Sequence, residues 1–160
     1  MPKAHRPQDR HPLDDAILAA RPAKPIPHEF VLDEIASLSP TTRPMFGCLA
    51  VYVEEKIVLI LRDKRAAPAD NGVWLATTAE HHESLRREFP QMRSIRVLGG
   101  KPTQWQLLPA DDPDFETTAL RACKLIRAGD PRIGKIPKSR SSSKLRSGLP
   151  GRRQRKAGRR

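Results

Sequence analysis

The sequence predicts an α+β fold, with a mainly antiparallel sheet of about five strands and helices packed on it. Two runs rich in aliphatic and β-branched residues, 49–53 and 57–61, flank a short charged connector and predict a β-hairpin. An alternating segment at 93–98 is joined by a glycine turn to another at 104–108, which predicts a second hairpin. Residues 112–129 combine an apolar face with the start and stop signals of a helix.

The first half of the body is expected to hold one helix and three strands. The helix should run over about 28–38, because apolar residues recur on one face there and Pro40 prevents its continuation. The two strands of the first hairpin follow it directly. A third strand is expected at 73–77, after a loop that begins at Pro68.

The second half is expected to contribute a short helix, the second hairpin and a final helix. Thr77 and Glu80 have the spacing of a capping box that opens the short helix. In the final helix, Asp112 is the expected cap, Pro113 the first residue and Gly129 the stop. Its inward face should consist of Phe115, Ala119, Ala122, Cys123 and Ile126.

Charge and proline content divide the chain into three parts. Of its 30 Lys and Arg residues, 12 lie in 131–160, which contains no Asp or Glu, whereas 1–130 holds 18 residues of each sign. The net charge of +12 therefore comes entirely from the last part. We expect a flexible Pro-rich leader at 1–27, an α+β body at 28–130 and a disordered tail at 131–160, because the tail cannot bury enough apolar surface to offset its ordering entropy. On this view a chain ending at Asp130 keeps its fold.

The tail is the strongest candidate for a binding segment. Flexible arginines and lysines follow a phosphate backbone and gain affinity from counterion release, so the tail should bind DNA or RNA with little sequence preference. It has no aromatic residue for base stacking and no apolar face for a membrane. The expected phosphate-contacting residues are Lys135, Lys138, Arg140, Lys144, Arg146, Arg152, Arg153, Arg155, Lys156, Arg159 and Arg160. A local patch on the body, Arg86 and Arg87 with Arg93 and Arg96, is expected at most to assist.

No catalytic, metal or cofactor motif stands out. Residues 129–136 resemble a phosphate-binding loop, but Ile136 replaces the hydroxyl that would ligate magnesium. His81 and His82 point about 100° apart on a helix and make a poor metal site. The carboxylates of 111–116 are explained by helix capping and by the helix dipole. We therefore expect a protein that is not an enzyme and holds no cofactor.

Cysteine usage and hydropathy indicate a cytoplasmic protein. Cys48 and Cys123 belong to no ligand cluster and are expected to be reduced core residues. The N-terminus lacks the apolar stretch of a signal peptide, and the longest aliphatic run, 57–61, is too short to cross a bilayer.

The segment Arg43-Pro44-Met45-Phe46-Gly47, followed by an apolar hairpin, resembles the TfoX/Sxy N-terminal domain family. That family has Arg and Met-Phe-Gly ahead of a strand, although here Cys48 stands where a second glycine is common. Residues 105–114 resemble the family's closing strand and helix entry, and 85–90 are similar to the related MmcQ/YjbR domains. The resemblance covers about 28–130 and implies a compact α+β domain associated with competence regulation, with no established catalytic residues. The basic tail stands where longer members carry a C-terminal module.

Two functions remain open at this point. The first is a non-enzymatic bacterial accessory or regulatory protein whose tail binds nucleic acid while its body binds a protein partner or a second copy. The alternative is a small-molecule-binding or cryptic enzymatic domain with a pocket near Met45-Phe46-Gly47. We expect Gly47 to permit either a close backbone approach or a positive φ, and Phe46 to lie in the core, so that Phe46→Ala costs roughly 3–5 kcal/mol.

Overall fold

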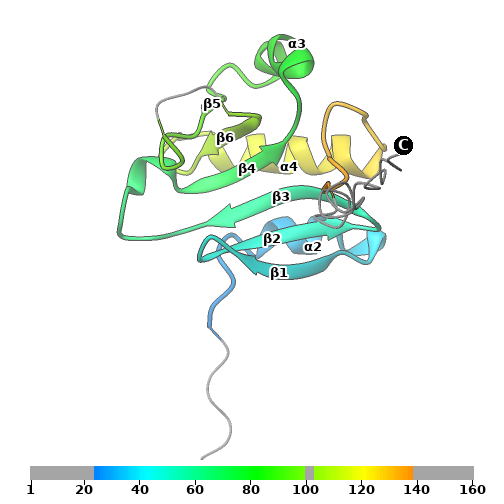
Figure 1. The fold of residues 1–160 in the computed structure, drawn as a ribbon, viewed down its shortest axis with the longest axis horizontal. Helices are drawn as coiled ribbons and strands as arrows, with labels where there is room; N and C mark the ends of the chain where they lie inside the picture. The colour runs from blue at the N-terminus through cyan, green and yellow to red at the C-terminus, as the bar shows by residue number, and fades with distance from the viewer. Residues whose placement is uncertain (1–23, 100–102, 139–160) are drawn as a thin grey trace, which may run out of the picture.

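A six-stranded antiparallel sheet forms the centre of the molecule. The computed structural model describes residues 24–99 and 103–138. The strand order is β1-β2-β3-β4-β6-β5, so β6 lies between β4 and β5 (Figure 1). The strands are β1 (Thr41–Met45), β2 (Cys48–Val53), β3 (Lys56–Arg62), β4 (Gly72–Ala76), β5 (Arg93–Ser94) and β6 (Trp105–Pro109). The expected α+β class with an antiparallel sheet is confirmed.

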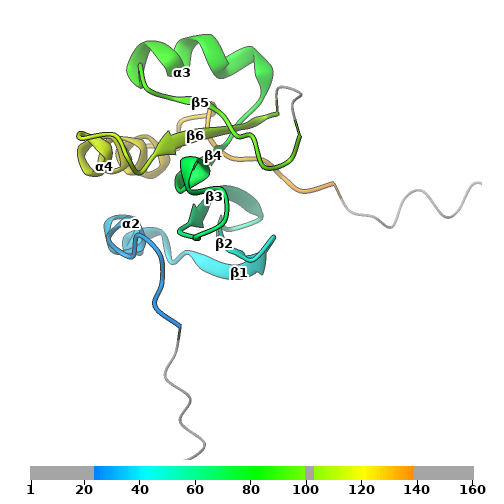
Figure 2. The same ribbon diagram turned by 90° about the vertical axis from the view of Figure 1, so that its left-hand side faces the viewer.

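Two helices cover one face of the sheet. Figure 2 shows α2 (Phe30–Glu34) and α4 (Phe115–Arg127) on the same side of the strands, whereas α3 (His82–Glu88) lies at one end, beyond β5. The larger core cluster lies under these helices. It combines Val31 and Ile35 with the strand residues Leu59, Leu61, Val73 and Leu75, with Leu85 and Phe89, and with Ala119, Ala122, Cys123 and Ile126.

The opposite face of the sheet carries a smaller core. Ala50, Ile60, Trp74 and Leu107 are at most 1% exposed there, and Ile95 from the segment after β5 packs with them. Because β3 and β4 are buried on both faces, their sequences are almost continuously apolar and do not alternate.

The first strand was not predicted. β1 pairs with β2 along its whole length, from Thr41 opposite Tyr52 to Met45 opposite Cys48. Its residues are mostly exposed and include Pro44, which carries no N–H to donate. An edge strand tolerates both features because only one side of it is hydrogen-bonded to the sheet.

Several element boundaries differ from the predictions. The capping box is absent: α3 begins at His82, after a 3₁₀ turn at Ala79–His81, and no side chain caps either element. The second hairpin exists but is short, because only Arg93 and Ser94 pair with β6. The final helix begins at Phe115, and no side chain caps it. The predicted cap, Asp112, instead accepts a bond from the backbone N–H of Asp114, which lies just before the helix.

The body extends past residue 130, so the expected boundary at 131 is wrong for the first eight residues of the tail. Gly129 ends α4 with φ +71°, and the chain then returns to the sheet. Ile133 is 5% exposed and joins the larger core. The Gly134 N–H donates to Ala76 O at 2.7 Å, and Lys135 exchanges two backbone bonds of 2.9 Å with Ile57. We call residues 131–138 the C-terminal clip.

Arg132 ties this clip to α3. Its guanidinium lies 2.7 Å from an Asp130 carboxylate oxygen and 2.6 Å from one of Glu88. The Arg132 side chain hydrogen bond is the largest cause of a lowered Asp130 pKa. The C-terminal clip is thus held to the body by the buried Ile133 side chain, by three backbone hydrogen bonds and by the ion pair of Arg132 with Glu88.

Candidate functional site

The structure places two of the predicted phosphate-contacting residues. Lys135 lies within the C-terminal clip, and its ammonium group contacts the side-chain oxygen of Gln104. Lys138 is exposed at the last described position. The remaining nine predicted residues lie outside the described part of the chain: Arg140, Lys144, Arg146, Arg152, Arg153, Arg155, Lys156, Arg159 and Arg160.

The expected patch on the body is neutralised at two of its four arginines. Arg93 forms an ion pair of 3.0 Å with buried Asp70, and Arg87 pairs with Glu83 at 2.5 Å on the surface of α3. Arg86 and Arg96 are exposed. Among the described residues, this patch therefore offers two arginines without an ion pair, half of the positive charge that the sequence suggests.

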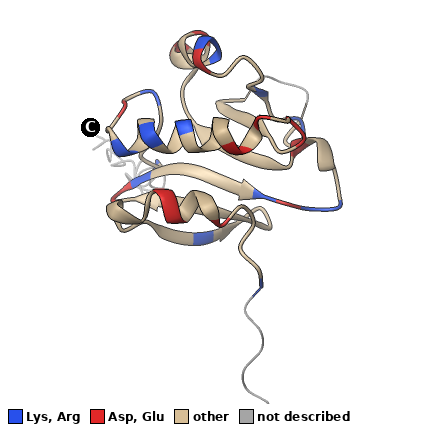
Figure 3. Ribbon diagram, turned by 180° about the vertical axis from the view of Figure 1, so that it is seen from behind, with Lys and Arg blue, Asp and Glu red and all other residues tan. Residues whose placement is uncertain are grey.

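A row of basic side chains on α4 was not predicted as a site. Arg121, Lys124 and Arg127 recur every third residue and occupy the C-terminal half of the helix, whereas its N-terminal end is acidic (Figure 3). Arg127 is paired with Glu34 at 2.8 Å, and an Arg121 N–H donates to the Glu88 carbonyl at 3.4 Å. The i, i+3 spacing was the signal for this row, and it also suits the negative end of the helix dipole.

The β1–β2 turn holds the residues that carry the family resemblance. Phe46 and Gly47 are the two residues of the turn, with φ of +53° and +69°. Positive φ at both positions is the type I′ geometry that matches the twist of a two-residue hairpin. The expected positive φ of Gly47 is confirmed. The predicted burial of Phe46 is wrong, since the residue is 62% exposed at the tip of the turn.

The other two residues of this motif support the strand. Met45 is half-buried against the smaller core. Arg43 is exposed on β1, and its guanidinium carbon lies 5.2 Å from the centre of the Tyr52 ring, a cation–π contact with the neighbouring strand.

The loop between β3 and β4 is organised by a buried arginine. Arg62 is 5% exposed. Its guanidinium donates to the carbonyls of Ala66 and Ala67 and to the side-chain oxygen of Asn71, at 2.6–2.8 Å. Within the described residues these acceptors are neutral, and Arg62 makes no ion pair there. The loop therefore keeps a positive charge beneath its surface.

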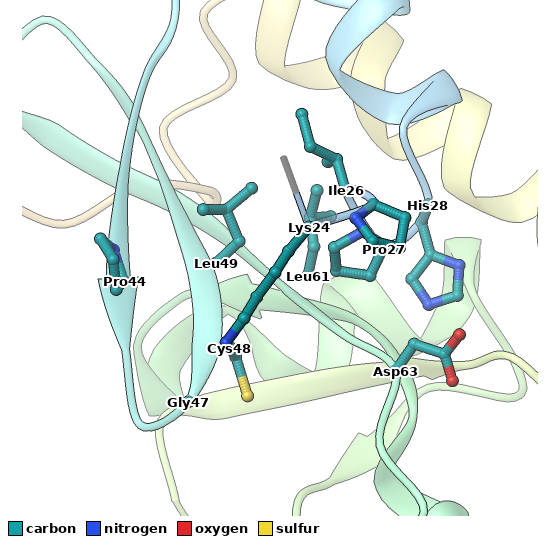
Figure 4. Close-up of a pocket in the computed structure, with 11 residues that line it drawn as sticks. Lys24, Ile26, Pro27, His28, Pro44, Gly47, Cys48, Leu49, Leu61 and Asp63 are labelled. Carbon is teal, nitrogen blue, oxygen red and sulfur yellow. The ribbon is translucent and has the colours of Figure 1, made fainter. Parts of the chain in front are cut away.

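A pocket opens between this loop, the β1–β2 turn and the segment that leads into α2. Its volume is about 690 Å³, within the range of small-molecule sites. Apolar side chains form most of its wall: Pro25, Ile26, Pro27, Pro44, Cys48, Leu49 and Leu61. Lys24, His28 and Asp63 are the polar side chains of the lining (Figure 4). Only one feature of the sequence pointed to this pocket, the turn at Phe46-Gly47.

The two cysteines are unpaired and lie in different cores, as predicted. Burial raises the pKa of the Cys123 thiol to about 12, and the charge of Glu34 adds to the effect. Cys48 lines the pocket, and its thiol lies 3.6 Å from Phe46 O. In the described residues no group of three or more His, Cys, Asp and Glu side chains is placed to hold a metal, and no helix is long and apolar enough to span a bilayer.

Substitutions of Phe46 and Gly47 should show whether the turn affects the free energy of unfolding through backbone strain or through burial of the Phe46 side chain. Phe46→Asn is expected to leave the free energy of unfolding unchanged or to raise it by up to about 1 kcal/mol, since asparagine tolerates positive φ better than phenylalanine. Gly47→Ala should lower it by about 1 kcal/mol, because a Cβ is strained at this φ. Urea unfolding of both variants measures the difference. A loss of several kcal/mol in Phe46→Asn would show that the side chain is buried after all.

Comparison of the chain with protein-family models, with curated proteins and with solved structures finds no match. Membership of the TfoX/Sxy N-terminal domain family thus stays a prediction from the sequence motifs at 43–47, 85–90 and 105–114.

Proposed function

We propose that this chain is a non-enzymatic accessory or regulatory protein of the bacterial cytoplasm, with a body of the TfoX/Sxy N-terminal type and a basic tail that binds DNA or RNA. The observation that carries the proposal is the charge distribution. Residues 131–160 hold 12 cations and no acid, whereas the remaining chain sums to zero. A polyanion is the partner that such a segment suits best.

The contacts of the body support a role for the tail rather than for a folded basic face. Most of the arginines around α3 and β5 are already paired with carboxylates. The C-terminal clip fixes the start of the tail on the sheet, through Ile133 and the Lys135–Ile57 bridge. The body is then free to bind a protein partner or a second copy while the tail contacts phosphates.

Electrophoretic mobility shift of a short DNA duplex and of single-stranded RNA, at several salt concentrations, tests the proposal in the full chain. If about half of the 12 tail cations contact phosphate, the logarithm of affinity for the duplex should fall against the logarithm of salt with a slope near −5. Replacing the six cations of residues 151–160 by glutamine should lower the affinity roughly tenfold or more and flatten the slope.

Two matched controls keep the charge of residues 151–160 and change either the type of the cationic side chains or the order of the residues. Arg→Lys changes throughout 151–160, or a scrambled order of the same residues, should preserve most of the affinity, because charge is recognised and not sequence. All variants should unfold at the same urea concentration as the parent chain. Unchanged binding by the glutamine variant would refute the tail as the binding segment.

A further inference from the structure

The described surface has one recess whose chemistry specifies a ligand, the pocket between Lys24–His28, the β1–β2 turn and the β3–β4 loop. It lies apart from the C-terminal clip. The pocket is next to the β1–β2 turn, whereas the C-terminal clip pairs with Ile57, close to the β2–β3 turn at the other end of β2. A ligand in this pocket would therefore not contact the clip.

The wall of the pocket is apolar and rigid. Three prolines and Leu49, Leu61 and Ile26 supply most of it, and proline walls lose little conformational entropy when a ligand packs on them. Figure 4 shows the Lys24 side chain reaching across the pocket in the direction of Cys48, with His28 and Asp63 on the side away from Pro44. An apolar ligand with one charged end fits such a lining.

The charges around the pocket favour an anionic end. Lys24 lines it, and the Lys64 ammonium approaches the turn, where it donates to Phe46 O at 3.2 Å. The Arg62 guanidinium lies in the adjoining loop with only neutral acceptors in the described residues. Against these three cations stands one carboxylate in the lining, Asp63.

Backbone strain is also concentrated here. Five non-glycine residues in the described chain have a positive φ. Of these, His28 lines the pocket, Phe46 precedes the lining residue Gly47, and Ala67 lies further along the β3–β4 loop. His28 is held by a 3.0 Å bond to Arg62 O, and Ala67 by the Arg62 guanidinium. Strained backbone of this kind persists where surrounding contacts impose it, and it clusters at ligand sites.

We propose that this pocket binds a small amphipathic monocarboxylate, with its apolar part against Ile26, Leu49 and Leu61 and its carboxylate paired with Lys24. Asp63 disfavours a second negative charge, so a dicarboxylate binds less well. His28 Nε2 is already engaged with Arg62 O and serves to hold the wall.

The two cysteines supply a direct readout in the full-length protein. Cys48 lines the pocket, whereas Cys123 is 1% exposed in the other core. Octanoate, below its micelle-forming concentration, is expected to raise the thermal midpoint and to slow alkylation of Cys48 by iodoacetamide, as measured by peptide mass. 1-Octanol should protect less than octanoate, and octylamine should not protect. Cys123 should remain unreacted throughout and report any unfolding.

Matched substitutions test the two ends of the ligand. Lys24→Met should weaken octanoate protection about tenfold, the loss of one charge-assisted bond. Ile26→Ser, at a residue that is 39% exposed and thus not needed for folding, should weaken it as well. Their controls in the C-terminal clip, Lys138→Met and Ile136→Ser, retain the tail and should leave protection unchanged.

Three results would overturn the proposal. Equal protection of Cys48 by octylamine and octanoate, or no effect of Lys24→Met, would show that the charge of the ligand is not recognised. No protection by octanoate at any concentration below its micelle-forming limit would show that the pocket does not bind this class of ligand. None of these results bears on the mobility-shift experiment, which reads the tail alone.

Discussion

A chain that ends at Asp130 is expected to be less stable than the full chain by roughly 3–5 kcal/mol, although the composition of the removed segment suggests a dispensable tail. Ile133 is 5% exposed in the larger core, so its removal leaves a cavity. Removal of the clip also leaves Ala76 O and both backbone groups of Ile57 without their partners. The Arg132 bridge to Glu88 is lost as well.

Urea unfolding of chains of different length measures this effect. A chain that ends at Lys138 keeps every clip contact and should unfold at the same urea concentration as the full chain, whereas the one that ends at Asp130 should unfold much earlier. In the full chain, Ile133→Ala should reproduce a large part of the loss, about 2–4 kcal/mol. Equal stability of the two shortened chains would mean that the clip contributes nothing to the fold. For this reason the nucleic-acid experiment uses substitutions and not truncation.

The central strands and the last helix could be predicted because their apolar patterns are dense. Residues 57–61 and 73–76 are buried on both faces of the sheet, and such strands are apolar almost throughout. Of the expected inward residues of α4, Phe115 is half-buried and the other four are buried: Ala119, Ala122, Cys123 and Ile126. In each case the apolar pattern of the segment itself, continuous in the strands and helical in α4, was enough to place the element without knowledge of its neighbours.

β1 and the C-terminal clip could not be predicted in this way. β1 is an exposed edge strand with Arg43 and Pro44 at its centre, and its pairing depends on the free edge of β2. The clip buries a single apolar side chain, Ile133, which stands between cations in the sequence, and most of its other contacts are backbone hydrogen bonds. Backbone pairing with a distant strand leaves little trace in the side chains of a short segment.

The pocket could not be predicted from the sequence for a similar reason. Its lining comes from three segments, 24–28, 44–49 and 61–63, that the fold brings together. Sequence reasoning reached the middle one through Phe46 and Gly47, but assigned Phe46 to the core because it is large and apolar. A two-residue hairpin turn places that side chain outside the sheet, and this turn geometry depends on β1, a strand that was not predicted.

Asp70→Asn is expected to lower the free energy of unfolding at neutral pH by roughly 3 kcal/mol. Asp70 is 1% exposed, and its two carboxylate oxygens accept bonds from Arg93 at 3.0 Å and from the backbone N–H groups of Arg96 and Val97 at 2.7 and 2.8 Å. These bonds fix the segment after β5, which carries Ile95 into the smaller core. An asparagine cannot accept all three, because its amide nitrogen would face a donor.

The matched control is Asp111→Asn. Asp111 is exposed in the loop before α4, so this change should alter the free energy of unfolding by less than about 0.5 kcal/mol. If the two variants unfolded at the same urea concentration, the three bonds to Asp70 would not hold the segment after β5.

The same carboxylate should make the protein sensitive to acid. Burial tends to raise the pKa of Asp70, but the bonds from Arg96, Val97 and Arg93 outweigh burial and hold it below 3.8, the usual value for Asp. Because the folded-state pKa is lower than the unfolded one, the unfolded chain takes up the proton first as the pH falls. The stability from Asp70 is therefore complete above the ordinary Asp pKa and is lost as the pH falls through the folded value.

Measured from about pH 5 downward, the free energy of unfolding should fall less steeply in Asp70→Asn than in the parent chain. Asp130, whose pKa is also lowered, by its bonds with Arg132, should keep the slope of the variant above zero. Parallel curves for the two proteins would show that Asp70 titrates alike in the folded and unfolded states.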